Sequence, residues 1–117
     1  MISIIIPTLN EESTVEEMLS QFSDELIESH DIELILSDGG STDGTLSLAK
    51  GRARIVLDHP RDRRQTIGEG RNLGARHSSG DVLFFFNADV RAANMERYLR
   101  VMQEALQVPK VVAATCP

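Results

Sequence analysis

The chain has 117 residues, enough for one domain with one hydrophobic core. Its 41% hydrophobic and 26% charged residues are typical of a globular protein, and a net charge of −6 argues against general nucleic-acid binding. The only cysteine, Cys116, excludes an internal disulfide and a cysteine-based metal cluster. Together with the absence of a signal-peptide pattern and of an apolar run near the ~18 residues of a membrane helix, it predicts a cytoplasmic location with no membrane segment.

Apolar residues along the chain predict strands that alternate with helices. Short apolar runs predict strands over residues 2–6, 32–36, 53–57, 82–86 and 110–115. Helical spacing predicts helices over residues 15–26, 46–49, 68–80 and 94–106, and Ser13 or Thr14 with Glu16 or Glu17 predicts a capping box at the start of the first. This alternation indicates an α/β fold, a mostly parallel sheet with helices on both faces, in a single domain over residues 1–117.

The strand predicted over residues 82–86 runs directly into Asn87-Ala88-Asp89. Five consecutive apolar residues predict a strand buried on both faces in the middle of the sheet. Residues i and i+2 of an extended chain project to the same side, so Asn87 and Asp89 are expected to project together. A carboxylate there suits Mg²⁺ in company with phosphate oxygens. The alternative is that Asp89 caps the turn into the next helix.

Polar residues follow three of the predicted strands, over residues 7–11, 38–40 and 87–89. The carboxyl ends of parallel strands share one edge, so these segments are expected to converge on one crevice. The stretch DGGSTDGT, residues 38–45, fits neither G-x-G-x-x-G nor the phosphate loop G-x-x-x-x-G-K-[ST], which argues against a dinucleotide site and a P-loop. Its alternative interpretation is a strand-to-helix turn capped by Ser41, Thr42 or Asp43.

Charge is distributed unevenly along the chain. Residues 1–49 contain eleven acids and no Lys or Arg, whereas residues 50–76 contain eight bases and three acids. An Arg-rich segment suits a phosphorylated small molecule, and the alternative is a solvated, charge-balanced surface. His30, His59 and His77 show no ligand spacing and are expected to be surface or loop histidines.

Three stretches in order, ISIIIPTLNEE, ELILSDGGSTDGT and GRNLGARHSSGDVLFFFNAD, resemble family 2 glycosyltransferases of the GT-A fold over nearly the whole chain. The resemblance implies a Rossmann-like GT-A sandwich. It also implies that a nucleotide-diphosphate sugar donor binds at the carboxyl edge of the sheet, with Mn²⁺ or Mg²⁺ bridging its diphosphate.

Carried over by position, the resemblance assigns nine residues to the donor site. The base and ribose pocket would be formed by Pro7, Thr8, Glu11, Asp38 and Gly39, and Asp38 matches the acid that contacts the nucleobase or ribose. Arg64 and Arg71 would contact the diphosphate or the pocket, Asn87 would hydrogen-bond the ribose or nucleotide, and Asp89 would bind the metal.

The chain departs from the family pattern at several places. Asn87 stands where the first Asp of Asp-x-Asp is usual and adds no charge for the metal, Gly39 replaces a second acid, and Leu9 replaces an aromatic residue near the base. Family members continue into an acceptor-binding half that supplies the general base, and the residues after 89 do not resemble it. Glu96 and Glu104 are expected to be helix-surface carboxylates.

Two functions therefore stay open. One is a glycosyltransferase that moves a sugar from its nucleotide-diphosphate donor to an unknown acceptor, with an unidentified base. The other is a non-catalytic or incomplete nucleotide-sugar-binding module. A sugar nucleotidyltransferase is disfavoured because its Gly-rich N-terminal loop with a following Lys is absent. Apolar surface left open by a missing half predicts self-association into a homo-oligomer.

Overall fold

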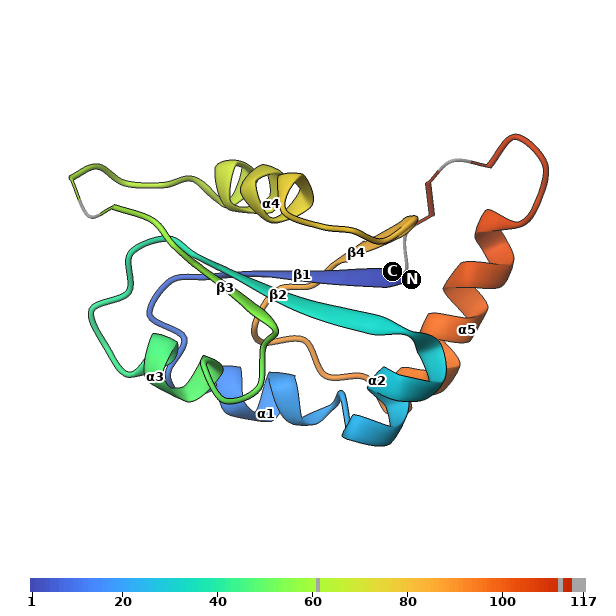
Figure 1. Ribbon diagram of the computed structural model, residues 1–117, viewed down its shortest axis with the longest axis horizontal. Coiled ribbons are helices and arrows are strands. Elements are labelled where there is room, and N and C mark those ends of the chain that lie inside the picture. Colours follow the sequence, from blue (N-terminus) through green and yellow to red (C-terminus); the bar gives the residue numbers. More distant parts are fainter. Residues whose placement is uncertain (61, 112, 115–117) are drawn as a thin grey trace.

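The computed structural model describes residues 1–60, 62–111 and 113–114 (Figure 1). The strands of this part are β1 (Ile2–Thr8), β2 (Ile32–Asp38), β3 (Ile55–Asp58) and β4 (Val82–Phe85). Its helices are α1 (Val15–Ser20), α2 (Asp24–His30), α3 (Thr45–Ala49), α4 (Ile67–Arg76) and α5 (Met95–Leu106). The predicted α/β class is confirmed. No helix of the described residues is long and apolar enough to cross a membrane.

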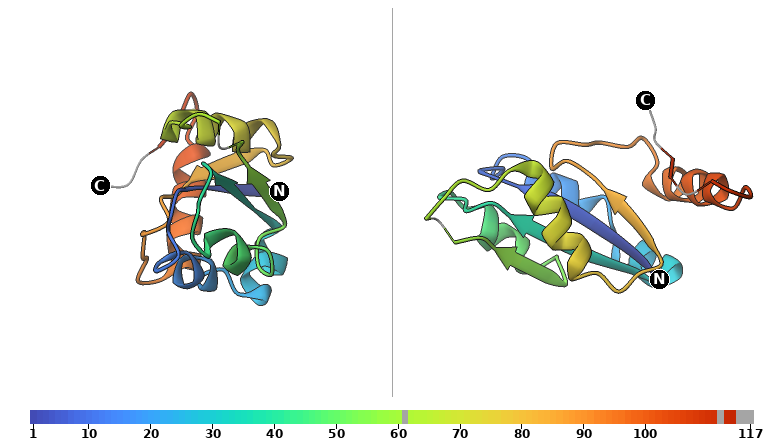
Figure 2. Two further views of the ribbon diagram at one scale, coloured as in Figure 1. Left: turned by 90° about the vertical axis from the view of Figure 1, so that its left-hand side faces the viewer. Right: turned by 90° about the horizontal axis from the view of Figure 1, so that it is seen from above.

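The sheet is parallel throughout its described strands, in the order β3-β2-β1-β4. Ile2 lies in register with Ile32 of β2 on one side and with Val82 of β4 on the other. The chain thus builds the sheet outward from β1 to β3 and then returns to place β4 on the other side of β1. Helices α1, α2 and α3 lie on one face and α4 on the other, as the views in Figures 1 and 2 show.

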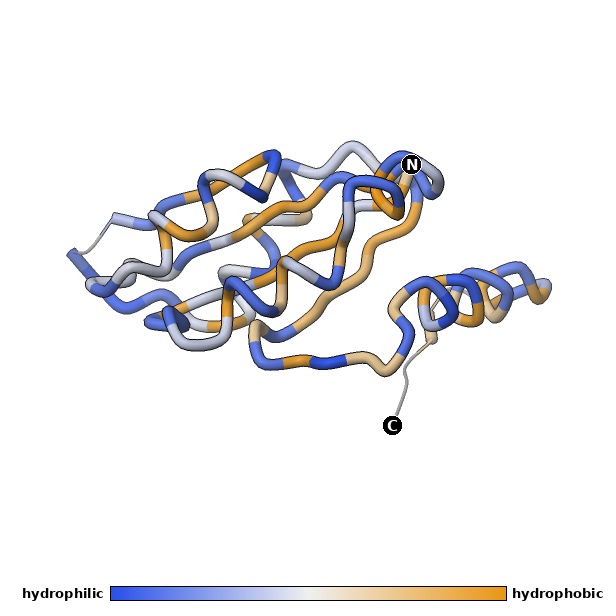
Figure 3. Tube along the Cα trace, turned by 90° about the horizontal axis from the view of Figure 1, so that it is seen from below, coloured by the Kyte–Doolittle hydropathy of each residue, from blue (hydrophilic) through white to orange (hydrophobic). Residues whose placement is uncertain are grey.

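Burial of β1 on both faces explains its unbroken apolar sequence. Ile4 and Ile6 belong to the core that also contains Met18 and Phe22. Ile5 is fully buried on the opposite face, where Gly74 of α4 comes so close that an added Cβ would lie 2.5 Å from Ile5 Cγ2. Figure 3 shows hydrophobic strands through the centre and mostly hydrophilic loops at the left end, which is the carboxyl edge of the sheet.

The strand β4 differs from its prediction. It lies at the edge of the described sheet, and only alternate side chains are buried: Phe84 and Phe86 are 7% and 5% exposed, whereas Leu83 and Phe85 are 38% and 45% exposed. Phe86 packs against Tyr98 of α5 with ring centroids 5.5 Å apart. The apolar run correctly indicated a strand, but burial on both faces was wrong because α4 packs on β1 and β2 and leaves this side of β4 open.

The helix predicted over residues 15–26 is divided into α1 and α2. Ser23 has extended backbone and its Oγ accepts a hydrogen bond from Leu26 N at 3.1 Å, so a second helix begins there. The capping box predicted at Ser13 or Thr14 does not form at this helix start. Instead, Thr14 Oγ1 donates to Glu11 Oε2 at 3.2 Å.

The strand predicted over residues 110–115 does not form in the part of it that the structure describes. Lys110 lies in a turn with a φ of 71°, and Val111 N donates to Val108 O at 3.1 Å. A left-handed residue and a local turn bond interrupt the extended backbone that a strand needs. Residues 112 and 115, like Cys116, lie outside the described residues.

Candidate functional site

Three polar loops meet at the carboxyl edge of the sheet, as the topology predicts. The ends of β2, β1 and β4 are neighbours in the strand order, and Thr8 at the end of β1 lies in register with Asp38 at the end of β2. From β1 the chain adds β2 and then β3 on one side, and it later adds β4 on the other side of β1, so the strand order reverses between β1 and β4. In open α/β sheets such a reversal opens a crevice outside the strand ends in which ligands bind.

Asp38 organises the loop that follows β2. It is fully buried, and its carboxylate accepts from four donors of the described chain. Thr8 Oγ1 and Ser41 Oγ donate to Oδ1 at 2.8 and 2.6 Å, while Gly40 N and Ser41 N donate to Oδ2 at 3.0 and 2.7 Å. The carboxylate therefore faces into the protein, where its charge is compensated by hydrogen bonds.

A second set of hydrogen bonds joins the loop after β1 to the loop after β2, and we call it the loop clasp. Asn10 N donates to Ser41 Oγ at 2.8 Å, Thr42 N donates to Asn10 Oδ1 at 2.9 Å, and Glu11 N donates to Thr45 Oγ1 at 2.9 Å. Asn10 has a φ of 51°, a left-handed conformation that Asn tolerates better than most residues. Sequence reasoning missed these roles, although an Asn directly after a strand is a recognisable turn signal.

Asp43 completes the clasp and starts α3. Its Oδ1 accepts from Thr45 N at 3.0 Å and from Thr45 Oγ1, and its Oδ2 accepts from Glu12 N at 3.2 Å. The hydrogen bond from the Thr45 hydroxyl is the main reason that the pKa of Asp43 lies below its ordinary value. None of the three residues predicted to cap this helix occupies its N-cap position, which is Gly44, although Asp43 directly before it accepts a hydrogen bond from Thr45 N.

The segment after β4 forms a turn in which Val90 N donates to Asn87 O at 3.2 Å. Asn87 and Asp89 are exposed and Ala88 between them is buried. Residues 88 and 89 belong to the turn, so the extended backbone assumed for the joint projection of Asn87 and Asp89 ends before Asp89. The alternative role of Asp89 as a helix cap is wrong, because Asn94 caps α5. No hydrogen bond or ion pair joins the Asp89 carboxylate to another described residue.

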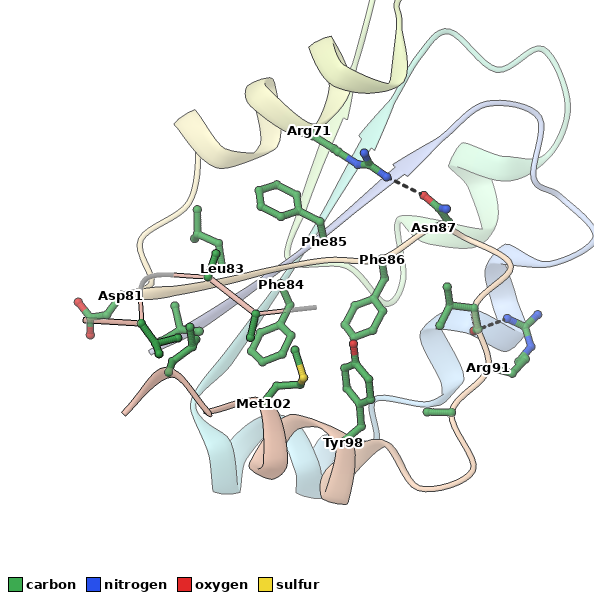
Figure 4. Close-up of a pocket in the computed structure, with 17 residues that line it drawn as sticks. Arg71, Asp81, Leu83, Phe84, Phe85, Phe86, Asn87, Arg91, Tyr98 and Met102 are labelled. Carbon is green, nitrogen blue, oxygen red and sulfur yellow. Dashed lines mark hydrogen bonds between the residues drawn. The ribbon is translucent and has the colours of Figure 1, made fainter. Parts of the chain in front are cut away.

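Arg71 reaches from α4 to this turn. Its Nη2 donates to Asn87 Oδ1 at 3.1 Å, and Figure 4 shows the side chain extending past Phe85 toward the amide. The Nε of Arg71 is buried and has no acceptor among the described residues. Arg64 is exposed, and no hydrogen bond links its side chain to the described part of the chain. The structure thus joins Arg71 to the turn after β4, and the Arg64 side chain has no such contact among the described residues.

Another base of the Arg-rich segment has a structural role. Arg63 Nη2 lies 2.8 Å from Glu69 Oε2, and the hydrogen bond from Arg63 is the main reason that the pKa of Glu69 is lowered. Glu69 also forms a capping box with Thr66 at the start of α4. Arg63 therefore fits the interpretation as part of a charge-balanced surface better than the interpretation as a phosphate-binding residue.

The histidines lie away from any metal-binding arrangement. His30 Nε2 lies 3.3 Å from Glu96 Oε1, which confirms Glu96 as an exposed helix-surface carboxylate but gives His30 a partner that the sequence did not indicate. His77 is exposed, with Nδ1 3.0 Å from Leu73 O. His59 follows β3 with a buried Nε2 that has no partner among the described residues.

Few side chains of the described residues could bind a metal ion. The described residues contain no group of three or more His, Cys, Asp or Glu side chains that could hold an ion. Asp89 offers one exposed carboxylate of the hard oxygen type that Mg²⁺ and Mn²⁺ prefer. It fits as one ligand of an ion whose other ligands are phosphate oxygens and water, which is a common way of holding Mg²⁺.

A groove of about 1120 Å³ runs along the outer side of β4, between this strand, α5 and Val111, Ala113 and Ala114 (Figure 4). Its walls are mixed: they include the apolar side chains of Phe84 and Met102 and the charged side chains of Asp81 and Arg91. Arg71 and Asn87 line the groove as well, so only its end at the carboxyl edge coincides with the candidate site.

Comparison with known proteins agrees with this arrangement. Residues 3–117 match the sequence model of the family described as "Glycosyl transferase family 2". The chain belongs to glycosyl transferase family 2. A curated relative, validoxylamine A glucosyltransferase from Streptomyces hygroscopicus subsp. limoneus, is 30% identical over 122 aligned positions, which cover 99% of this chain and 26% of the relative.

Solved structures of glycosyltransferases share the fold. The mannosyltransferase PcManGT from Pyrobaculum calidifontis, in complex with GDP-Man and Mn²⁺, superposes with a TM-score of 0.83 at 25% identity, covering 99% of this family 2 chain and 35% of that one. Glucosyl-3-phosphoglycerate synthase from Mycobacterium tuberculosis, in complex with Mn²⁺, UDP and glucosyl-3-phosphoglycerate, superposes at 0.68 with 29% identity, covering 94% and 40%. The chain therefore spans about a quarter to two-fifths of the length of these relatives.

Proposed function

We propose that the chain binds a nucleotide-diphosphate sugar at the carboxyl edge of its sheet and that the protein transfers the sugar to an acceptor hydroxyl. The observation that carries this proposal is the meeting of three polar loops where the strand order reverses, in a chain of glycosyl transferase family 2. Two structural neighbours are complexes with GDP-Man and Mn²⁺ or with UDP and Mn²⁺, which supports the same class of donor here.

The loops after β1 and β2 would form the base and ribose pocket. Pro7 and Glu11 are half-buried at this edge and can contact a ligand directly. Thr8 and Asp38 are buried and joined by a hydrogen bond, so we propose that they stabilise the conformation of the loops around the pocket. Gly39 would contact the ligand through its backbone, since an added Cβ would point toward Gln65 Oε1 and Thr8 O, each 3.4 Å away.

The turn after β4 would receive the diphosphate. Asp89 would hold Mn²⁺ or Mg²⁺, which when bound supplies positive charge to the departing diphosphate. Arg71 adds a permanent positive charge beside the turn, and Arg64 lies on the loop that leads into α4. In the transfer step, the acceptor oxygen bonds to the anomeric carbon as the bond from that carbon to the diphosphate oxygen breaks, and an unidentified base takes the proton of the acceptor hydroxyl.

A nucleotide-sugar-binding module is the second candidate. Asn87 in place of an acid favours it. The two candidates share donor binding and differ in turnover. Release of free sugar from UDP-glucose or GDP-mannose by the protein would identify the transferase, and tight donor binding without hydrolysis or transfer would identify the module.

Calorimetric titration of UDP and GDP, with and without Mn²⁺, tests the donor site. The variant is Asp89→Ala, and its matched control is Asp81→Ala, an exposed acid at the opposite end of β4. We expect Mn²⁺ to strengthen nucleotide binding in the wild type and in Asp81→Ala. In Asp89→Ala the metal-dependent affinity should fall by at least about tenfold, or 1.4 kcal/mol. Absence of binding to either nucleotide under every condition would refute the proposed site.

A further inference from the structure

We infer that Arg91 and Gln21 are positioning residues that fix the turn after β4, and with it the Asp89 carboxylate, on helix α1. The inference rests on the proposed function, in which this carboxylate holds the metal. It adds a role for two side chains that touch neither the nucleotide nor the metal. We call the contacts that these two side chains make the turn brace.

The guanidinium of Arg91 has an acceptor for each of its five N–H groups. Its Nη1 donates to two carbonyls of the turn segment, Val90 O at 2.8 Å and Ala88 O at 3.4 Å. Its Nη2 donates to Thr14 O and to Glu17 Oε2, both at 3.2 Å, and its Nε lies 3.0 Å from Glu17 Oε1. A guanidinium has no further donor. Arg91 is therefore fully occupied as a link between the turn and α1, and this arrangement leaves it no donor for a phosphate.

Gln21 holds the same backbone from the other end of α1, where it is the C-cap residue. Its Nε2 donates to Val90 O at 2.8 Å, and its Oε1 accepts from Ala92 N at 2.8 Å. One amide thus bonds the backbone on both sides of Arg91. Val90 O accepts from both Arg91 and Gln21, which its two lone pairs allow, so the two side chains hold one short segment together.

Helix α1 is a firmly packed support for the brace. Its Val15, Met18 and Leu19 are completely buried in the core. At its start, Val15 N donates to Glu11 O at 2.8 Å, and Glu11 N is joined to Thr45 in the loop clasp. The turn after β4 and the two clasped loops are therefore attached to the same helix, which sets their positions relative to one another.

The brace should act on the metal-dependent part of nucleotide binding. The Asp89 carboxylate is exposed and makes no hydrogen bond or ion pair with another described residue, so its position depends on the backbone of the turn. Without the brace, the turn would place this carboxylate correctly in only a fraction of its conformations. Apparent affinity falls in proportion to that fraction. Nucleotide contacts that do not involve the metal should be unaffected.

Titration of UDP and GDP, in Mn²⁺ and in EDTA, tests the inference with Arg91→Lys, Arg91→Gln and Gln21→Glu. Lys keeps the charge of Arg91 but has three donors in place of a planar set of five. Gln21→Glu keeps the shape of the side chain and removes its donor, so it tests the brace even if the Arg91 variants do not fold. The matched controls are Arg97→Lys and Arg97→Gln, at an exposed position of α5.

We expect affinity in Mn²⁺ to fall at least about fivefold in all three brace variants, while affinity in EDTA stays within about twofold of wild type. Both Arg97 controls should behave as wild type under either condition. Hydrogen exchange of the nucleotide-free protein provides a second readout. The amides of Val90 and Ala92 should exchange at least about tenfold faster in Arg91→Lys than in wild type or in Arg97→Lys.

Several results would overturn the inference. Affinity in Mn²⁺ that is retained in Arg91→Lys and lost in Arg91→Gln would mean that Arg91 acts through its charge. Equal losses in Mn²⁺ and in EDTA would indicate direct contact with the nucleotide, and unchanged affinity in all three variants would show that the brace is dispensable. If the wild type binds no nucleotide at all, the proposed function fails, whereas hydrogen exchange still decides whether the brace holds the turn.

Discussion

Replacement of Asp38 by Asn separates a role in holding the loops from a role in direct nucleotide contact. Asp38 Oδ2 accepts from two backbone amides, Gly40 N and Ser41 N, which cannot turn away. Its Oδ1 accepts from the hydroxyls of Thr8 and Ser41, which can rotate and point their hydrogens elsewhere. An Asn must therefore place its oxygen at the Oδ2 position and its NH₂ group against the hydroxyls. Thr8 Oγ1 can accept from this NH₂ group. Ser41 Oγ, which accepts from Asn10 N, can accept as well, but its own O–H group loses Asp38 Oδ1 as acceptor.

The cost can be worked out from these bonds. Each of the two backbone bonds changes from a charged to a neutral acceptor, which loses about 1 kcal/mol, and the Ser41 hydroxyl loses its acceptor for about 1 kcal/mol more. We expect Asp38→Asn to lower the free energy of unfolding by about 3 kcal/mol, a large part of the ~5–15 kcal/mol of a typical domain. For a chain of this length the melting temperature should fall by roughly 10 °C.

Urea unfolding of Asp38→Asn measures this loss, with Asp89→Asn as the matched control. Asp89 is exposed and makes no hydrogen bond or ion pair within the described chain, so the same change there should stay within about 0.5 kcal/mol of wild type. If Asp38→Asn is as stable as Asp89→Asn, the carboxylate does not hold the loops in the way its hydrogen bonds indicate. Weakened nucleotide binding without lost stability would instead favour direct contact.

Two further predictions concern packing and pH. Glu33 is 2% exposed; burial tends to raise its pKa, but hydrogen bonds from Ser3 and from backbone amides outweigh this and hold the pKa below 4.5. Because the folded pKa lies below the unfolded one, the carboxylate stabilises the fold fully above pH 4.5 and loses this contribution as the pH falls through the folded pKa. The gap in unfolding free energy between wild type and Glu33→Gln should therefore close in acid, and a gap that stays constant between about pH 7 and pH 3 would contradict this assignment. Gly74→Ala should cost about 1–3 kcal/mol, since its Cβ would lie 2.5 Å from Ile5 Cγ2, whereas Gly51→Ala, with no atom within 4 Å, should be neutral in the same denaturation assay.

Sequence patterns predicted most of the helices and strands and the edge at which the polar loops meet. The apolar runs over residues 2–6, 32–36 and 82–86 correspond to strands β1, β2 and β4 of one parallel sheet, so their order along the chain was enough to predict that their carboxyl ends converge. The identity of the family could also be read from motifs in order, because they fall at these strand ends. Such signals are local, and each depends only on residues close together in the chain.

The position of β4 could not be predicted in the same way. A run of apolar residues reports that a strand forms, but its burial depends on which strands and helices pack beside it. Phe84 is buried and Phe85 is 45% exposed, although the two residues have the same side chain. The difference arises because α5 lies near one face of β4 while α4 packs on its neighbours.

The roles of the polar side chains were likewise decided by tertiary structure. The nucleotide contact of Asp38 stays a prediction, and its carboxylate accepts hydrogen bonds that include one from Thr8, 30 residues away. Asn10 reaches Thr42 across 32 residues, and Arg71 reaches Asn87 across 16. The sequence by itself determined which polar groups come to this edge of the sheet. Folding alone decided which donor meets which acceptor, because hydrogen bonds depend on distances of about 3 Å between segments whose separation in sequence carries no such information.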